Sequence, residues 1–225
     1  MTLPGRPIPR RRVLLADPDI DPEASTVKFR LTYAGQLLAA GSNNRVDHKH
    51  EVRRVFHPQL RRYWNHHPFR KGWKEAERGV DPDDWPLKSS DLAVRFSRCG
   101  YRFVPLVTRD MWLSCSVEVL FLRPGWPGDI WHGGDIDNRL KIVFDALRLP
   151  SDANELGKHT TPVDDEDPFF CLLEDDSLVS HVSFETDVLL EALTDYIQKS
   201  DARLVITVTV VPAAVTMLNQ TFGGR

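Results

Sequence analysis

The chain has 225 residues, a formal net charge of −3, and 41% hydrophobic and 27% charged residues. This length suits one large domain, and the apolar content is sufficient for a packed core. No apolar run approaches the ~18 residues that a membrane span requires. The three cysteines have no CxxC spacing that would indicate a disulfide framework or a zinc site. The sequence therefore predicts a soluble, cytoplasmic protein.

The charge is distributed unevenly along the chain. Residues 1–110 contain 21 Lys and Arg against 13 Asp and Glu, a balance of +8, and residues 111–225 contain 8 against 19, a balance of −11. A basic first half and an acidic second half are consistent with a phosphate-binding surface beside carboxylates that bind cations. Two oppositely charged surfaces that simply pack together explain the same pattern, and charge alone favours this plainer explanation.

The first half of the chain predicts an arm, a strand and a helix. Residues 1–25 are rich in proline and basic residues, which is typical of an extended arm, and residues 26–225 are expected to form one domain. Apolar and polar residues alternate over 27–33, which indicates a strand. A helix is expected from about Asp47, and Pro58 should interrupt it or begin a second short helix. Residues 65–110 show no sustained period and predict a loop-dominated insertion with one short helix near Ser89–Phe96.

The second half predicts two further helices and three strands. Apolar residues alternate over 113–121 and 178–184, and residues 203–211 have the strongest strand pattern of the chain. Helices are expected over about 138–148, where apolar residues have the spacing of a buried face, and over 187–199. A long acidic loop over 149–170 leads to a short apolar run. The order β-α-β-α-β-(α)-β implies an α/β fold in which helices pack on a mixed sheet.

The most informative segment is Gly134-Asp135-Ile136-Asp137-Asn138-Arg139-Leu140-Lys141. In a continuous helix Asp135 and Asp137 would point apart, because residues i and i+2 differ by about 200°. If residues 135–137 are extended instead, the two side chains share a face, and Asp137 becomes the N-cap of the helix that follows. Lys141 then lies one turn further along on the same side. The three side chains would converge at a helix N-terminus, which favours a phosphate.

A second acidic segment, Glu174-Asp175-Asp176, stands at the expected start of a strand. Carboxylates from a helix start and a strand start can hold Mg²⁺, which prefers oxygen ligands. Two such ions can activate a water in phosphodiester hydrolysis, while a lysine neutralises charge on the phosphate. Each piece also has a structural explanation. Asp137 can simply cap a helix, Lys141 can pair with Asp137 and Asp145, and residues 174–176 can form a solvated turn.

Basic and aromatic residues are interleaved over 53–74. This pattern is typical of a surface that follows a phosphate backbone, but a solvated helix face explains it equally well. The basic residues that would contact DNA phosphates are Arg53, Arg54, Arg61, Arg62, Arg70 and Lys71.

Taken together and in this order, the motifs resemble the RusA family of Holliday junction resolvases, which are small Mg²⁺-dependent endonucleases of bacteria and their phages. The family pattern has a D-x-D-N-x-x-K segment that opens a helix, then an F-D-A-L stretch, then a D-D at the start of a strand. These match Asp135–Lys141, Phe144–Leu147 and Asp175-Asp176, and an early S-N-N-R matches Ser42–Arg45.

The resemblance implies a RusA-like fold and a catalytic site. The implied ligands of Mg²⁺, or of Mn²⁺ as its substitute, are the catalytic Asp135, Asp137 and Asp176 together with Asp175. Lys141 would be the lysine that neutralises the phosphate, with Asn138 in support. Further DNA-binding candidates are Asn43, Asn44 and Arg45. The implied partners are branched DNA, above all four-way junctions, and a second copy of the chain in a homodimer.

The chain departs from the family in its length, in its acidic balance and in the long connection between the F-D-A-L helix and the D-D. The insertions at about 65–110 and 149–170 leave the motif residues in place but bear on junction selectivity. The expected function is a Mg²⁺-dependent, structure-selective endonuclease of DNA recombination and repair, associated with the nucleoid. Two alternatives stay open. One is a nuclease of the same fold that acts on other branched or foreign nucleic acid in phage–host conflict, and the other is a DNA- or partner-binding protein without turnover.

Overall fold

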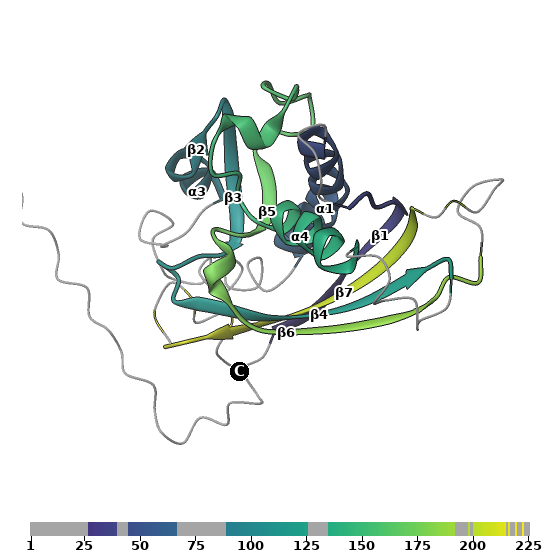
Figure 1. Ribbon diagram of the computed structural model, residues 1–225. Helices are drawn as coiled ribbons and strands as arrows, with labels where there is room; N and C mark the ends of the chain where they lie inside the picture. Colours follow the sequence, from purple (N-terminus) through teal and green to yellow (C-terminus); the bar gives the residue numbers. More distant parts are fainter. Residues whose placement is uncertain are drawn as a thin grey trace, which may run out of the picture.

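The structure is a computed structural model of the chain, and it describes residues 27–39, 45–66, 89–125, 135–191, 198, 200–214, 216, 219 and 222. Helices pack against two β-sheets, one of four strands and one of three (Figure 1). Each sheet has both parallel and antiparallel neighbours, so the expected α/β class with mixed sheets is confirmed. The expected arm at 1–25 lies outside the described residues. Within those residues, no helix is long and apolar enough to cross a membrane.

The larger sheet has the strand order β1-β7-β4-β6. Its strands are β1 (Val27–Gln36), β4 (Leu113–Arg123), β6 (Val179–Val188) and β7 (Asp201–Pro212). Burial largely alternates along β4 and β7, because successive side chains point to opposite faces of a sheet. The predicted strands are therefore confirmed, and β6 forms a mostly exposed edge.

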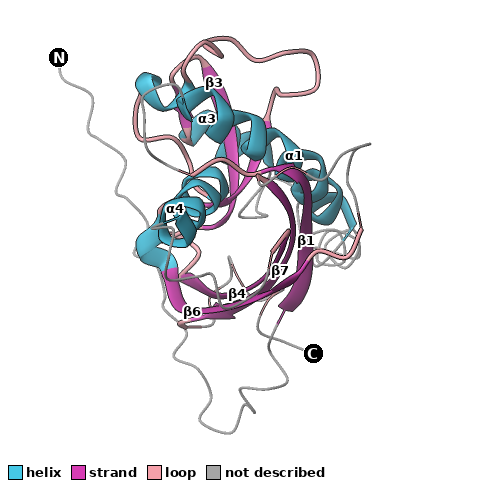
Figure 2. Ribbon diagram, turned by 45° about the vertical axis from the view of Figure 1, so that its right-hand side comes forward, coloured by secondary structure: helices cyan, strands magenta, loops and turns pink. Residues whose placement is uncertain are grey.

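Helix α4 (Asp135–Leu147) lies on the concave side of this curved sheet (Figure 2). Its buried apolar residues are Ile142, Val143, Ala146 and Leu147, which recur one turn apart and join the main core. The helix predicted over 138–148 is confirmed, although it begins earlier than expected, at Asp135.

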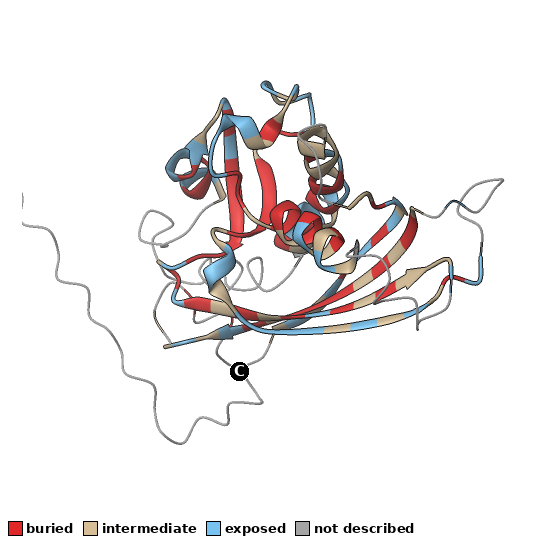
Figure 3. Ribbon diagram, viewed as in Figure 1, coloured by how far each residue is buried: buried red, intermediate tan, exposed pale blue. Residues whose placement is uncertain are grey.

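The smaller sheet has the order β2-β3-β5, with β2 (Ser97–Arg98), β3 (Tyr101–Val107) and β5 (Phe169–Leu173). β3 and β5 pair in parallel and are almost wholly buried (Figure 3). The expectation of a loop-dominated stretch over 65–110 is wrong for β2 and β3. A strand that is buried on both faces is apolar throughout and shows no alternation. The short helix predicted near Ser89–Phe96 is confirmed as α3 (Ser89–Arg95).

Helix α1 (Val46–His66) runs through Pro58 without a break, so the predicted interruption is wrong. Val52, Phe56 and Leu60 are buried at intervals of four residues, whereas Pro58 is exposed. An internal proline costs about 3 kcal/mol, because it removes one backbone hydrogen bond and crowds the preceding turn. The buried face of α1, which packs on β5, continues on both sides of Pro58 and offsets this cost.

The prediction of a helix over 187–199 is wrong at its beginning. Asp187 and Val188 still belong to β6, where they pair with Leu122 and Arg123 of β4. The Leu189 N–H then donates to the Arg123 carbonyl at 2.8 Å, which continues the strand-like pairing. Residues 192–197 lie outside the described residues.

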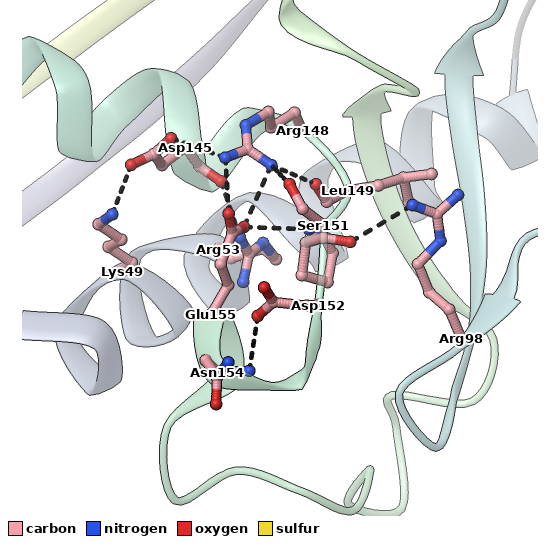
Figure 4. A network of polar contacts seen from close by, with 11 residues as sticks. Lys49, Arg53, Arg98, Asp145, Arg148, Leu149, Ser151, Asp152, Asn154 and Glu155 are labelled. Atoms are coloured by element: carbon pink, nitrogen blue, oxygen red, sulfur yellow. Dashed lines mark hydrogen bonds and ion pairs between the residues drawn. The ribbon is translucent and has the colours of Figure 1, made fainter.

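The connection between α4 and β5, expected to be a long acidic loop, packs against α1 and contains a 3-10 turn, η5 (Ala153–Leu156). Leu156 is fully buried. Arg148 ties the end of α4 to η5 through ion pairs with Asp145 at 3.1 Å and Glu155 at 2.9 Å (Figure 4). Further along, the buried Glu166 forms an ion pair with Arg54 of α1. The insertion is thus part of the folded core region.

We expect Gly157→Ala to lower the free energy of unfolding by about 1–3 kcal/mol. Gly157 has a φ of +59°, and a Cβ there would lie 2.1 Å from Asp47 Oδ1. That carboxylate accepts the Lys158 N–H at 2.8 Å and so joins the connection to α1. Urea denaturation measures the loss. The control is Gly125→Ala, which also has a positive φ but open space around its Cβ. An equal decrease in the free energy of unfolding in both variants would contradict the close packing of Gly157 against Asp47.

Buried histidines make the fold sensitive to acid. His50 is fully buried, and burial next to Arg53 lowers its pKa to about 3. Unfolded histidine binds a proton near pH 6.5, so its contribution to stability is complete above that pH and is lost as the pH falls towards 3. Below pH 6.5 the free energy of unfolding should decrease by about 1.4 kcal/mol per pH unit for His50 alone. Urea denaturation at about pH 7.5 and about pH 5 tests this, and equal stabilities would contradict it.

Candidate metal and nucleic-acid site

The D-x-D-N-x-x-K segment forms the first two turns of α4. Because the helix begins at Asp135, Asp137 is inside the first turn and is not the N-cap, so the predicted extended geometry of 135–137 is wrong. In a helix, residues i and i+2 do not face each other. Acidic residues in a first turn are stabilised by the helix dipole, which explains why the helix can start there. The side chain of Asp135 lies outside the described residues.

Asp137 and Lys141 are one turn apart and both exposed. In the part of the chain that the structure describes, neither side chain forms a hydrogen bond or an ion pair. The structural alternative, in which Lys141 pairs with Asp145, is not realised. Asp145 is buried and pairs with Lys49 at 2.5 Å and with Arg148. The carboxylate and the ammonium at the start of α4 are therefore accessible to a ligand, with the partly buried Asn138 between them.

The second acidic segment forms a 3-10 turn, η6 (Asp176–Leu178), directly before β6. Asp175 caps this turn by accepting the Ser177 N–H at 3.0 Å, and it also contacts Arg109 at 3.4 Å. Hydrogen bonds from Ser177 lower the pKa of Asp175. Asp176 is exposed. Asp175 thus has a structural role, whereas Asp176 is available to bind a ligand.

Within one copy of the chain the two acidic segments lie at opposite ends of α4. Ile136 and Leu140, from the first turns of α4, line one pocket together with Phe184 of β6. Phe184 is five residues beyond Val179, the start of β6, which is about 17 Å along the strand. At its other end α4 lies beside β5 (Figure 1). Leu149 follows the helix there, and its N–H donates to the carbonyl of Leu173, the last residue of β5, at 3.0 Å.

The structure therefore does not bring Asp137 and Asp176 together in one copy. Among the described residues, no group of three His, Cys, Asp or Glu side chains is placed to hold a metal ion. The expected convergence of Asp137 with Asp176 is absent because α4 runs from its acidic start towards β5, and the chain enters η6 from that far end. The sequence pattern contains the two segments but not the direction of the helix between them.

The predicted DNA-binding residues fall into three groups. Asn43, Asn44, Arg70 and Lys71 lie outside the described residues. Arg53 is 1% exposed and donates to the Asp145 carbonyl at 2.7 Å, so it cannot contact a phosphate backbone, and this prediction is wrong. Arg54 is engaged by Glu166, and Arg45 is partly buried at the start of α1. Of the candidates that the structure describes, only Arg61 and Arg62 are exposed, and Arg61 has one weak pair with Asp165 at 3.5 Å.

Replacing both Arg61 and Arg62 with alanine should weaken binding to all branched DNA substrates alike. Each neutralised phosphate contributes about 0.9 to the slope of log affinity against log salt, so the slope should flatten by up to ~2. Titrations at several salt concentrations measure this, with Arg102→Ala as the control, because Arg102 is exposed but paired with Asp167. An unchanged slope would show that this face of α1 is solvated and does not contact DNA.

Sequence reasoning missed Arg109, which follows β3 and reaches η6. Its Nη2 donates to Ser177 Oγ at 2.8 Å, and its backbone N–H donates to Glu174 Oε2 at 2.9 Å. No local pattern connects Arg109 with residues so distant in sequence, and only the packing of β3 beside β5 joins them. The F-D-A-L stretch, by contrast, serves the fold, because its Asp145 is part of the buried network in Figure 4.

No protein-family model matches the chain, and no curated protein or solved structure is detectably similar to it. What the chain does must therefore be inferred from its own residues and their geometry. Two places combine charged, exposed side chains: the first turns of α4, with Asp137 and Lys141, and the corner formed by η6 and Arg109.

Proposed function

We propose that the chain is a Mg²⁺-dependent, structure-selective DNA endonuclease of the RusA type that cuts four-way junctions. The observation that carries the proposal is the exposed pair Asp137 and Lys141 at the start of α4, which has no partner in the described residues. The first N–H groups of a helix favour an anion such as phosphate. A carboxylate at the same place suits a phosphate that arrives with a divalent cation.

The residues fit Mg²⁺ in their chemistry but not in their positions within one copy. Aspartate oxygens are the ligands that Mg²⁺ prefers, and the ion would supply an activated water for attack on a phosphodiester. Because Asp176 lies at the far end of α4, cleavage requires that it meets Asp137 in the DNA complex. That meeting needs a rearrangement of η6. Lys141 has a role that does not depend on this step, because it neutralises a phosphate bound at the helix N-terminus.

A homodimer suits this function, because a four-way junction presents two symmetric strands to a protein with two-fold symmetry. Among the described residues β6 pairs only with β4, so its other edge offers the surface. The other edge strand, β1, is less available for pairing, because Gln59 of α1 hydrogen-bonds the backbone N–H and carbonyl of Thr32. Antiparallel pairing of β6 with itself about Phe184 would place His181 opposite Asp187 of the second copy, so no like charges would meet.

A second candidate function, a DNA-binding protein without turnover, is favoured by the separation of Asp137 from Asp176. Such a protein would use Lys141 and the exposed arginines of α1 to bind DNA and would need no metal. It would also explain why Asp175 is committed to capping η6.

The two candidates are separated by one comparison of purified protein on labelled four-way, three-way, flap and linear DNA. The nuclease predicts paired nicks in the four-way junction that require Mg²⁺ and are supported by Mn²⁺. The binding protein predicts gel shifts without nicks under every metal condition. Nicks in three-way or flap DNA alone would instead favour a nuclease of other branched or foreign nucleic acid.

A further inference from the structure

Trp112 occupies a backbone conformation that tryptophan rarely adopts. It ends the turn between β3 and β4 with a φ of +52°, in the left-handed region that favours glycine. The turn is held firmly. The Trp112 N–H donates to the Arg109 carbonyl at 2.9 Å, and the Trp112 carbonyl accepts the Ala213 N–H at 2.8 Å. A bulky residue strains the backbone at such a position, whereas glycine or asparagine would adopt the same φ with little strain.

Burial of the Trp112 side chain does not offset this strain. The neighbours Met111 and Leu113 are buried in the core, but the Trp112 side chain is 49% exposed. One other non-glycine residue in the described ranges has a positive φ, Cys99, and it is smaller and sits with Gly100 in the tight turn between β2 and β3. An exposed indole in a fixed, strained turn is typical of a contact residue, because strained positions concentrate at binding sites.

The turn that ends at Trp112 begins at a charged residue, Arg109. The Arg109 side chain is 62% exposed and reaches Ser177 of η6 and Asp175, the N-cap of η6, so the turn and η6 form one corner of the fold. Nε and Nη1 of Arg109 have no hydrogen bond within the described residues, so they can meet a phosphate. A nucleobase is flat and its neighbouring phosphate is anionic, so it matches an exposed indole and an exposed guanidinium that belong to one turn.

We propose that Trp112 is a stacking residue for an unpaired nucleobase, with Arg109 contacting the adjacent phosphate. The inference rests on the proposed binding of branched DNA and names the part of the substrate that this corner takes, the unpaired base at a branch point. Because every base has a flat face, the contact carries no sequence preference. Loss of one such stack weakens binding by about 5- to 150-fold.

The test uses DNA with 2-aminopurine at the branch point, whose fluorescence falls when an aromatic ring stacks on it. The wild type and Trp112→Phe should quench this probe, whereas Trp112→Gly should not. Trp112→Gly should also bind branched DNA about 5- to 150-fold more weakly and bind intact duplex as the wild type does. Its melting temperature should equal or exceed that of the wild type, because glycine accepts a φ of +52°. Trp112→Asn, which also tolerates this φ, provides a second variant, and Val94→Ala, at an exposed site on α3, is the control.

The outcomes separate this inference from the proposed function. If Trp112→Gly binds and quenches like the wild type, the stacking role is overturned while DNA binding stands. If the wild type binds none of the DNA substrates, the proposed function fails and the stacking role fails with it.

Discussion

Asp137→Asn is expected to reduce cleavage of a four-way junction by more than about 100-fold, the upper range for groups that only support a metal ligand. Its carboxylate is exposed in the first turn of α4 and has no partner in the described residues, so its loss should leave the fold nearly intact. Removing an acidic residue from a first turn costs about 0.3–1 kcal/mol. DNA binding should persist or tighten, because a negative charge that faces phosphate is removed.

Single-turnover cleavage, gel-shift titration and thermal denaturation of one preparation measure the three quantities. The matched control is Glu118→Gln, which also removes an exposed carboxylate but lies on the face of the large sheet opposite α4. The control should cut at the wild-type rate. Cleavage by Asp137→Asn at the wild-type rate would show that the metal assignment at α4 is wrong.

Arg53→Ala is expected to lower the free energy of unfolding by about 3 kcal/mol or more. Arg53 is among the largest fully buried side chains in the described residues, and burial lowers its pKa to about 10, so it stays charged at neutral pH. Its guanidinium contacts His50 Nδ1 at 3.2 Å and the Asp145 carbonyl at 2.7 Å, which links α1 to α4. Alanine would leave a cavity and two buried acceptors without a donor.

The comparison with Arg62→Ala makes this prediction specific. Arg62 belongs to the same basic run but is exposed, and a surface substitution of this kind changes stability by no more than about 0.5 kcal/mol. Urea denaturation of both variants measures the difference. A loss below about 0.5 kcal/mol for Arg53→Ala would contradict its burial between α1 and α4.

Much of the fold follows from local sequence patterns. The alternation in β1, β4 and β7 and the apolar spacing of α4 specify these elements directly, because each has one buried face. Patterns failed where burial was two-sided or where tertiary packing overrode a local preference. β3 is buried on both faces, and α1 continues through Pro58 because its apolar face packs on β5.

The candidate site was less predictable than the fold. Sequence identified the segments at Asp137 and Asp176, but their distance depends on the direction of α4, which no local pattern encodes. Similarly, the basic run looked uniform in sequence, although the structure buries Arg53 and exposes Arg61. A helix turns its residues to opposite sides, so one run of charges serves both the core and the surface.

The most direct test of the central claim is to map the nicks that the purified chain makes in a four-way junction, with Mg²⁺ present and with the metal removed by a chelator. We predict nicks at symmetric positions in two opposing strands, dependent on the metal and absent in Asp137→Asn. A junction that is bound but left uncut, with Mg²⁺ or Mn²⁺ present, would contradict the nuclease and favour the binding protein.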